Sequence, residues 1–264
     1  MTIQGPVDHA DASCGIAVMA KASWPGRTKT RLVPPLSYAE AAAFNSAFLQ
    51  DVAANIMTAG RGRRISGYMA FGPPESRPFF HDLLPAEIGL IEAWHPDFGD
   101  CLFAAIDQLL DRGHDSAVVL NSDSPTLPTS LLLETARILA DPGDRVVLGP
   151  SADGGYYLLG IKQRHRCLFE SVAWSTEHVA RQTLERAAAA GLKVHLLPVW
   201  YDVDDVDSLR MLRSELCEGW SFAAALKPHA AHHSRRLLVS LLDETDLAFH
   251  LDRGAGQPLR KAAQ

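Results

Sequence analysis

The chain has 264 residues, of which 47% are hydrophobic and 21% charged, and its formal net charge is −6. This length allows one large α/β domain or two small ones, while the acidic balance argues against general nucleic-acid binding and no apolar run reaches the ~18 residues that span a membrane. The four cysteines are scattered without a C-x-x-C pair, which favours reduced thiols in a cytoplasmic protein.

Short apolar runs alternate with helix-forming segments along most of the chain. Residues 15–20 (GIAVMA) predict a buried first strand, and Ser37 with Glu40 fits a capping box that opens a helix to about residue 59. Further strands are expected at residues 65–71, 88–93, 117–120, 145–148, 156–161 and 194–197, and further helices at 101–112, 129–140, 176–190 and 206–216. This alternation indicates an α/β fold built on a mainly parallel sheet that helices cover.

The same pattern predicts how the chain is divided. Residues 1–14 are polar and unpatterned, which is typical of a flexible leader, and residues 15–217 form the predicted domain. Beyond that domain, residues 218–264 are expected to be an extension that is partly helical, with a short helix within 237–242, or disordered, above all at 254–264.

Residues 117–128 (AVVLNSDSPTLP) join a buried strand to a polar turn. Pro125 cannot donate to a sheet ladder, so the strand ends before it and leaves Asp123 at its carboxyl edge. Ligands of open α/β sheets bind outside the carboxyl ends of the strands, where Asp123 and neighbouring hydroxyl groups could hold a hard cation such as Mg²⁺. A capping aspartate in a strand-to-helix turn is the alternative.

A basic loop follows the first predicted strand. It carries Lys21, Arg27, Lys29 and Arg31 and contains no acidic residue, and Gly26 would let its backbone approach a ligand closely. At the carboxyl end of a strand, arginine forks and lysine point charges suit the oxygens of a polyphosphate. The loop matches neither the Walker pattern nor G-x-G-x-x-G, and a basic surface loop is the alternative.

Residues 149–157 (GPSADGGYY) and Trp174 are expected to form an acceptor pocket on the same edge. They offer a carboxylate, glycines that admit a ligand and aromatic rings. A hairpin turn, and for Trp174 a place in the core, are the alternatives. The residues predicted to bind the acceptor are Gly154, Gly155, Tyr156 and Trp174, and Asp153 is the candidate that orients or deprotonates an acceptor hydroxyl.

Four acids lie within residues 201–207 (YDVDDVD). Asp205 and Asp207 fit the start of the helix that follows, where the macrodipole favours negative charge. Asp202 and Asp204 precede that helix and alternate as on a strand, so one of them can face inward. A bound cation would relieve the repulsion among these acids, and solvent could do the same.

Four blocks, in this order, resemble a domain family of unassigned function in the glycosyltransferase-A superfamily: KASWPGRTKTRL, NSDSPTLP, GPSADGGYYLLG, and WST followed by YDVDDVDSL. Members are often labelled arsenosugar biosynthesis glycosyltransferases or nucleotide-diphospho-sugar transferases. The resemblance covers about residues 15–215. It implies a Rossmann-like three-layer α/β/α sandwich whose mainly parallel sheet contains one antiparallel strand.

The resemblance also implies roles for individual residues. Asp123 and Asp204 look like the two metal-binding aspartates of sugar nucleotidyltransferases, which would hold Mg²⁺ (or Mn²⁺), with Asp202 a candidate accessory ligand. Residues 29–32 (KTRL) resemble, more distantly, a block of phospholactate guanylyltransferases. The implied nucleotide- and phosphate-binding set is Lys21, Gly26, Arg27, Lys29, Thr30, Arg31 and Ser122. Two positions depart from the family, which usually has Arg where this chain has Cys101 and Gly where it has Asn121.

Three hypotheses follow from these residues. The first is a Mg²⁺-dependent glycosyltransferase that uses a nucleotide-diphospho-sugar and a small-molecule acceptor, with Lys29 and Arg31 stabilising the leaving diphosphate. The second is a nucleotidyltransferase that joins an NTP to a phosphorylated acceptor and releases pyrophosphate. The third is a nucleotide-binding protein that has lost its chemistry, as the change at Cys101 suggests.

Overall fold

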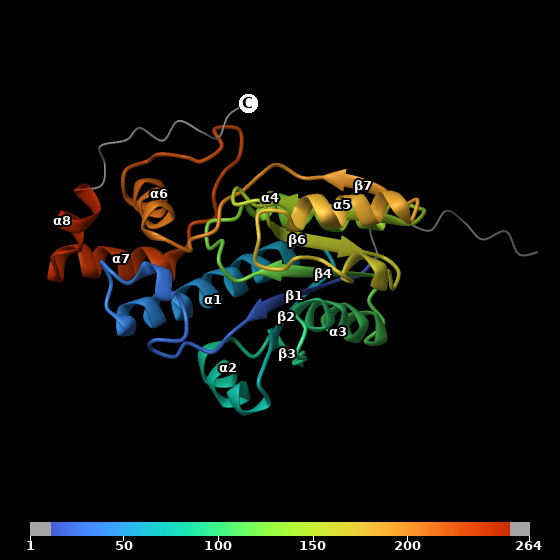
Figure 1. Ribbon diagram of the computed structural model, residues 1–264, viewed down its shortest axis with the longest axis horizontal. Coiled ribbons are helices and arrows are strands. Elements are labelled where there is room, and N and C mark those ends of the chain that lie inside the picture. The colour runs from blue at the N-terminus through green and yellow to red at the C-terminus, as the bar shows by residue number, and fades with distance from the viewer. Residues whose placement is uncertain (1–11, 254–264) are drawn as a thin grey trace, which may run out of the picture.

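The computed structural model describes residues 12–253, and its centre is one seven-stranded sheet (Figure 1). In the spatial order β3-β2-β1-β4-β6-β5-β7, the strands are β3 Gly89–Glu92, β2 Ile65–Phe71, β1 Cys14–Ala20, β4 Ser116–Asn121, β6 Tyr156–Ile161, β5 Arg145–Pro150 and β7 Lys193–Leu196. Only β6 runs antiparallel to its neighbours, β4 and β5, and all other pairs are parallel. The predicted mainly parallel sheet with one antiparallel strand is therefore confirmed.

The central strands are apolar along their whole length because both faces of the sheet are covered. In β1, Ile16 and Val18 belong to one hydrophobic cluster and Ala17 belongs to the other. In β4, Val118 and Val119 are likewise divided between the two clusters. Side chains alternate between the faces of a strand, so continuous apolar runs are what a doubly covered sheet requires.

Two helical layers enclose the sheet, which completes the three-layer α/β/α sandwich. One layer contains α1 Tyr38–Gly60, α2 Arg77–Leu83, α4 Thr129–Ala140, α6 Val206–Cys217, α7 His232–Glu244 and α8 Leu247–Asp252. The other contains α3 Phe98–Asp111 and α5 Val179–Ala189. Short 3₁₀ turns lie at Thr30–Leu32, Pro74–Ser76 and Arg166–Leu168. No helix in residues 12–253 is long and apolar enough to cross a membrane.

Two helix starts differ from the sequence prediction. Helix α3 begins at Phe98, three residues early, because the Asp97 carboxylate accepts the N–H of Asp100 and caps the helix. Helix α5 begins at Val179, three residues late, because Thr176 donates its hydroxyl to the carbonyl of Ala173 and so closes the preceding turn instead of capping the helix. By contrast, the capping box of Ser37 with Glu40 is present as predicted.

The structure also contains helices that the sequence pattern did not indicate. Helices α2 and α8 have only seven and six residues, too few for a helical period to stand out. Helix α7 is longer than the short helix expected within residues 237–242. The expectations for residues 1–11 and 254–264 lie outside the described residues, and the division into a leader, a domain and an extension remains a prediction.

Helix α7 is attached to α1 by a buried carboxylate. Asp51 of α1 is 1% exposed and accepts the backbone N–H groups of His233 and Ser234 at 2.9 and 2.8 Å. It also accepts the hydroxyl of Ser234 at 2.5 Å. These contacts satisfy the first N–H groups of α7 and place a negative charge at the positive end of its dipole.

We expect Asp51→Ala to lower the free energy of unfolding by about 2–3 kcal/mol, because it leaves the buried first turn of α7 without hydrogen-bond acceptors. Urea unfolding measures the change. Asp243→Ala, on the exposed side of the same helix, is the control and should change stability by less than about 0.5 kcal/mol. Equal effects of the two substitutions would contradict this account of how α7 is attached.

Candidate functional site

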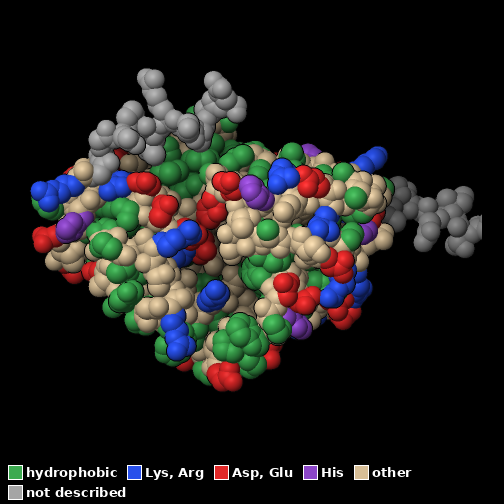
Figure 2. Space-filling view, viewed as in Figure 1, with side chains coloured by type: hydrophobic (Ala, Val, Ile, Leu, Met, Phe, Trp, Pro, Cys, Tyr) green, Lys and Arg blue, Asp and Glu red, His purple; other side chains and the backbone are tan. Residues whose placement is uncertain are grey.

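A cavity of about 570 Å³ opens at the carboxyl ends of the parallel strands. Its wall is formed by the residues that follow β1, β2, β3 and β4, by the β5–β6 turn and by the segment after β7. Figure 2 shows a hollow in the middle of this face, with acidic and basic side chains next to one another along its edge. This is the edge of the sheet where ligands of open α/β folds bind.

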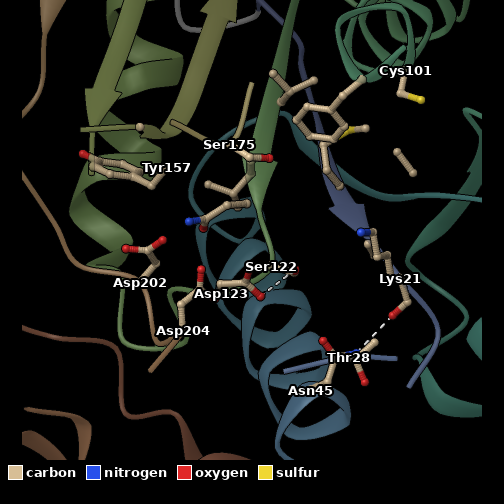
Figure 3. A pocket seen from close by; sticks show the side chains of 18 of the residues that line it. Lys21, Thr28, Asn45, Cys101, Ser122, Asp123, Tyr157, Ser175, Asp202 and Asp204 are labelled. Atoms are coloured by element: carbon tan, nitrogen blue, oxygen red, sulfur yellow. Dashed lines mark hydrogen bonds between the residues drawn. The ribbon is translucent and has the colours of Figure 1, made fainter. Parts of the chain in front are cut away.

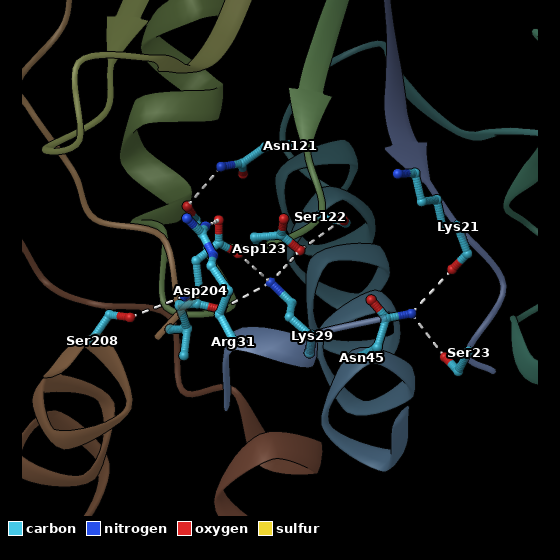
Figure 4. Close-up of polar contacts among 12 residues, drawn as sticks. Lys21, Ser23, Lys29, Arg31, Asn45, Asn121, Ser122, Asp123, Asp204 and Ser208 are labelled. Atoms are coloured by element: carbon cyan, nitrogen blue, oxygen red, sulfur yellow. Dashed lines mark hydrogen bonds and ion pairs between the residues drawn. The ribbon is translucent and has the colours of Figure 1, made fainter. Parts of the chain in front are cut away.

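Lys29 lies at the centre of the polar network on this edge (Figure 4). Its Nζ atom is 2.7 Å from Oδ1 of Asp123 and 2.8 Å from Oδ1 of Asp204, and it donates to the carbonyl of Val203 at 2.8 Å. The second oxygen of Asp204 accepts a hydrogen bond from Arg31. Asp123 and Asp204 therefore lie together as expected from the sequence, but a lysine ammonium group joins them.

The local backbone directs Lys29 into this position. Lys29 has φ 52° and ψ 35°, a left-handed conformation that non-glycine residues adopt at a cost of about 1 kcal/mol. Its side chain is only 5% exposed and its Nζ lies 5.2 Å from the centre of the Phe48 ring. Burial alone would lower the pKa of the ammonium group, but the charges of Asp123 and Asp204 outweigh burial and raise that pKa.

The acids of the cavity differ in their electrostatic environment. For Asp204, burial opposes ionisation, but attraction to Lys29 and Arg31 prevails and lowers the pKa of its carboxyl group. For Asp202, burial and then the charges of Asp153, Asp204 and Asp123 raise the pKa to about 7. Negative charge at Asp204 is therefore balanced by cations, whereas negative charge at Asp202 is not.

The four cations of the basic loop, residues 21–31, fall into two pairs. Lys29 and Arg31 are engaged by Asp123 and Asp204. Lys21 and Arg27 line the cavity and make no ion pair with any residue in 12–253. Figure 3 shows Lys21 across the cavity from Asp202 and Asp204. Lys21 and Arg27 are thus the cations available to an anionic ligand.

Two buried polar atoms in the cavity wall have no hydrogen-bond partner within residues 12–253: Oδ1 of Asn121 and the hydroxyl of Tyr156. Asn121 uses its amide nitrogen to donate to Ser124 at 3.1 Å. Buried polar groups are nearly always paired, so these two atoms stand out as unpaired groups in residues that line the cavity.

Most residues predicted for the site do line the cavity. They are Lys21, Arg27, Lys29, Thr30, Arg31, Ser122, Asp123, Asp153, Gly155, Tyr156, Asp202 and Asp204. Gly26, Gly154 and Trp174 do not. Gly26 instead supplies a turn with φ +77°, and Gly154 has φ +93° and packs so closely on the backbone of Glu177 that a Cβ atom would lie 2.2 Å from its carbonyl oxygen. Trp174 packs edge-on against the rings of Phe98 and Tyr156.

Several residues that were not predicted for the site also line the cavity, among them Asn45, Trp94, Phe98 and Ser175. Asn45 lies in the middle of α1, where its amide donates to the carbonyl of Lys21 and the hydroxyl of Ser23 and so fixes the basic loop. Trp94 and Phe98 are 58% and 46% exposed although both are large and apolar. A tryptophan directly after a strand was the signal that could have revealed this part of the site.

No group of three or more His, Cys, Asp or Glu side chains in residues 12–253 is arranged to hold a metal ion. Near Asp123, the Lys29 ammonium already bridges Asp123 and Asp204, the two aspartates that the resemblance implies as metal ligands. The donors that remain are the second carboxylate oxygen of Asp123, which no described residue engages, and the carboxylate of Asp202. Both are hard oxygen donors, which Mg²⁺ and Mn²⁺ prefer.

Comparison with protein families supports the fold and the resemblance. The model of a family described as “Uncharacterized protein conserved in bacteria (DUF2064)” matches residues 55–176. This segment is therefore similar to that family. The match confirms the resemblance to a domain family of unassigned function, and it includes the blocks around Asp123 and Asp153, while the basic loop and residues 201–207 lie outside it.

Solved structures share this fold. A protein from Desulfovibrio desulfuricans G20, described as a candidate nucleotide-diphospho-sugar transferase, matches with a TM-score of 0.76 and 24% identity over 91% of this chain and 98% of its own. A cytidylyltransferase from Leptospira borgpetersenii serovar Hardjo-bovis (strain JB197) matches with a TM-score of 0.51 and 12% identity over 89% and 96%. A CMP:2-keto-3-deoxy-manno-octonic acid synthetase complexed with CTP matches with a TM-score of 0.50 and 13% identity, over 79% of this chain and 100% of its own. No curated protein matches the sequence.

Replacing Lys29 tests how the acids are held together. In metal-free buffer, we expect Lys29→Met to lower the free energy of unfolding by about 3 kcal/mol, because Asp123 and Asp204 lose their shared counter-charge. Millimolar Mg²⁺ should recover part of that loss in this variant. The control is Lys21→Met, which breaks no ion pair and should leave urea unfolding nearly unchanged. A Lys29→Met protein as stable as the wild type would contradict the proposed balance of charges.

Asp202 should affect stability in a pH-dependent way. The pKa of Asp202 is about 7 in the folded protein and near 3.8 in the unfolded chain. Protonated Asp202 therefore adds to the free energy of unfolding at low pH, and this contribution is lost as the pH rises through 7. In metal-free buffer we therefore expect Asp202→Asn to be more stable than the wild type above pH 7, by on the order of 2 kcal/mol, and the difference to disappear near pH 4. Thermal melts across this pH range measure the effect, with Asp207→Asn as the exposed control. A constant difference at all pH values would refute this assignment.

Proposed function

We propose that this protein is a nucleotide-dependent transferase that binds a nucleotide-diphospho-sugar and transfers its glycosyl group to a small-molecule acceptor. The observation that carries the proposal is the cavity itself. At the carboxyl edge of the sheet it places Lys21 and Arg27, which have no acidic partner among the described residues, opposite Asp202, whose negative charge no cation balances. A volume of about 570 Å³ is within the usual range for sites that bind small molecules and cofactors. The shared fold with a candidate nucleotide-diphospho-sugar transferase supports this choice.

The basic loop is suited to the diphosphate. Lys21 and Arg27 have no acidic partner among the described residues, so they can bind phosphate oxygens without breaking an existing ion pair. Lys29 and Arg31 hold Asp204 and Asp123 in place and add positive potential next to the same oxygens. Cations fixed before the reaction stabilise the charge that develops on a leaving diphosphate.

The exposed rings of Trp94 and Phe98 lie at the β3 side of the same cavity. Such exposed aromatic surface beside a polar site is suited to stacking with a flat heteroaromatic base. In this arrangement the base lies near Trp94, the phosphates lie at the basic loop and the transferred group lies toward Asp153 and Asp202. Asp153, whose carboxylate accepts the N–H of Gly155 at 2.9 Å, is then positioned near the acceptor hydroxyl.

The residues also fit the divalent cation that the resemblance implies. Negative charge at Asp202 has no balancing cation, and the second oxygen of Asp123 is not engaged by Lys29, so these two carboxylates would hold Mg²⁺ or Mn²⁺. Asp204, which is paired with Lys29 and Arg31, would then act by positioning Lys29. When bound, the ion would supply positive charge to the diphosphate leaving group.

Nucleotidyl transfer is the second candidate, and one observation favours it. The basic loop places Lys29 and Arg31, which acids engage, beside the unpaired Lys21 and Arg27, and this concentration of cations also suits a triphosphate. Two matching structures are a cytidylyltransferase and a synthetase complexed with CTP. In that reaction a phosphorylated acceptor attacks the NTP and pyrophosphate leaves.

The products distinguish the two reactions. The protein is first screened by thermal shift against NTPs and nucleotide-diphospho-sugars, with and without Mg²⁺, because a ligand that binds the native state raises the apparent stability. The ligands that bind are then incubated with the protein, and the release of nucleoside diphosphate or of pyrophosphate is measured. Glycosyl transfer predicts nucleoside diphosphate from a nucleotide sugar, and consistent release of pyrophosphate from an NTP would refute it.

Asp123→Asn tests the dependence on metal. We expect this variant to bind the nucleotide sugar at least tenfold more weakly in Mg²⁺, a loss of about 1.4 kcal/mol, and to bind it no more tightly in Mg²⁺ than in EDTA. Asp207→Asn is the matched control, since Asp207 is exposed and pairs with Arg210 away from the cavity. Unchanged, metal-independent binding by Asp123→Asn would favour a nucleotide-binding protein without catalytic metal chemistry.

A further inference from the structure

Lysine and arginine side chains line only one part of the described cavity. Every Lys and Arg of the described residues that lines it belongs to the basic loop, residues 21–31. The opposite part, which we call the acidic wall, consists of Ser151, Asp153, Gly155, Tyr156, Tyr157, Ser175 and Asp202. The acidic wall thus offers carboxylates, hydroxyl groups and aromatic rings, and no Lys or Arg among the described residues.

We propose that the acidic wall binds an acceptor that carries a hydroxyl group but no phosphate or other strong anion, that is, a neutral or cationic alcohol or sugar. This inference rests on the proposed function, because it assumes that the basic loop is occupied by the phosphates of a nucleotide. It deepens that function by assigning the chemical class of the second substrate.

The first argument is electrostatic. The carboxylates of Asp153 and Asp202 both belong to the acidic wall and line the cavity, so this wall presents negative charge to a ligand. Lys29 and Arg31 are engaged by Asp123 and Asp204, and the nucleotide takes Lys21 and Arg27. A phosphate group placed at the acidic wall would face Asp153 and find no free cation, because the divalent ion that Asp202 and Asp123 would hold is taken by the diphosphate of the nucleotide. Repulsion from a single like charge at this range weakens binding by roughly tenfold.

The second argument concerns hydrogen bonding. Oδ1 of Asn121 can only accept, and it is buried in the cavity wall without a donor within residues 12–253. The unpaired hydroxyl of Tyr156 lies in the same wall. If a rotation of either side chain turns its polar atom toward the cavity, an alcohol can donate to Oδ1 of Asn121 or accept from the Tyr156 hydroxyl, whereas a fully ionised phosphate has no hydrogen to donate to Asn121. Both orphan atoms therefore fit a hydroxyl-bearing acceptor.

The third argument is the packing behind the acidic wall. Trp174 contacts the rings of Tyr156 and Phe98, with ring centres 6.4 and 5.4 Å apart. Tyr157 is fully buried and donates its hydroxyl to the carbonyl of Pro198 at 3.0 Å. The tyrosines are thus held by aromatic and backbone contacts, and Tyr156, which is half-buried, offers ring surface against which the carbon skeleton of a sugar or alcohol can pack.

Calorimetry with inorganic phosphate tests the proposal. The protein is first titrated with nucleoside diphosphates in Mg²⁺, and the one that binds most tightly is added to saturation so that the basic loop is occupied. Inorganic phosphate is then titrated into this complex. We expect no saturable binding of phosphate at millimolar concentration by the wild type. Asp153→Lys, which places a cation on the acidic wall, should create millimolar binding, at least tenfold tighter than any in the wild type.

Glu177→Lys is the matched control, because it makes the same change of charge on a side chain that is 78% exposed outside the cavity, and it should create no phosphate site. Asp153→Asn is the second variant, because it preserves an acceptor for the N–H of Gly155 and should give weaker phosphate binding than Asp153→Lys. Thermal melts establish that each variant is folded.

The outcomes separate this inference from the proposed function. Phosphate binding by the nucleotide-saturated wild type would overturn the inference alone and favour a phosphorylated acceptor. Equal behaviour of Asp153→Lys and Glu177→Lys would also overturn it, because the acidic wall would then not face the second substrate site. If no nucleoside diphosphate or nucleotide sugar binds in the first titration, the proposed function fails and the inference fails with it.

Discussion

The Lys29 ammonium group joins three parts of the chain that are far apart in sequence: the basic loop after β1, the turn after β4 and the segment after β7. Its position explains how two carboxylates can lie together on a partly buried edge without strong mutual repulsion. The same interaction consumes part of the positive charge of the basic loop. The charge that remains available to a ligand is therefore set by this ion pair, and the composition of the loop alone overstates it.

The surroundings of Lys29 restrict how far its partners can move. The N–H of Val203 donates to the carbonyl of Asp123 at 2.8 Å, and the hydroxyl of Ser124 donates to the carbonyl of Tyr201 at 2.9 Å. The C-terminal part of the chain adds a further contact, because the N–H of His229 donates to the carbonyl of Thr126 at 3.0 Å. Backbone contacts on both sides thus fix the two acid-bearing segments before any ligand binds, as a preorganised electrostatic site requires.

Local features made part of this arrangement predictable. The apolar run before Asp123 and the proline after it fixed the end of β4, and parallel strands bring their carboxyl ends to one edge. The side-chain pairing was not predictable. The left-handed backbone of Lys29 and its contacts with Val203 and Asp204, which lie 174 and 175 positions further along the chain, leave no local sequence pattern. The length of helix α7 was underestimated for a similar reason, because its first turn is stabilised by Asp51, which is distant in the sequence. Trp94 was not predicted because a single exposed tryptophan forms no periodic pattern in the sequence.

Under the proposed function, the distribution of unpaired charges explains why a nucleotide–metal complex would suit this cavity better than either component alone. Lys21 and Arg27 lack an anion among the described residues, and Asp202 lacks a cation. A nucleotide without metal would satisfy the basic loop and increase the negative charge in front of Asp202. A metal ion without a nucleotide would satisfy Asp202 and add to the positive charge near Lys29. Only a ligand that brings both charges balances the two sides at once, so the unequal distribution of cations over the cavity is itself an argument for coupled binding of metal and diphosphate.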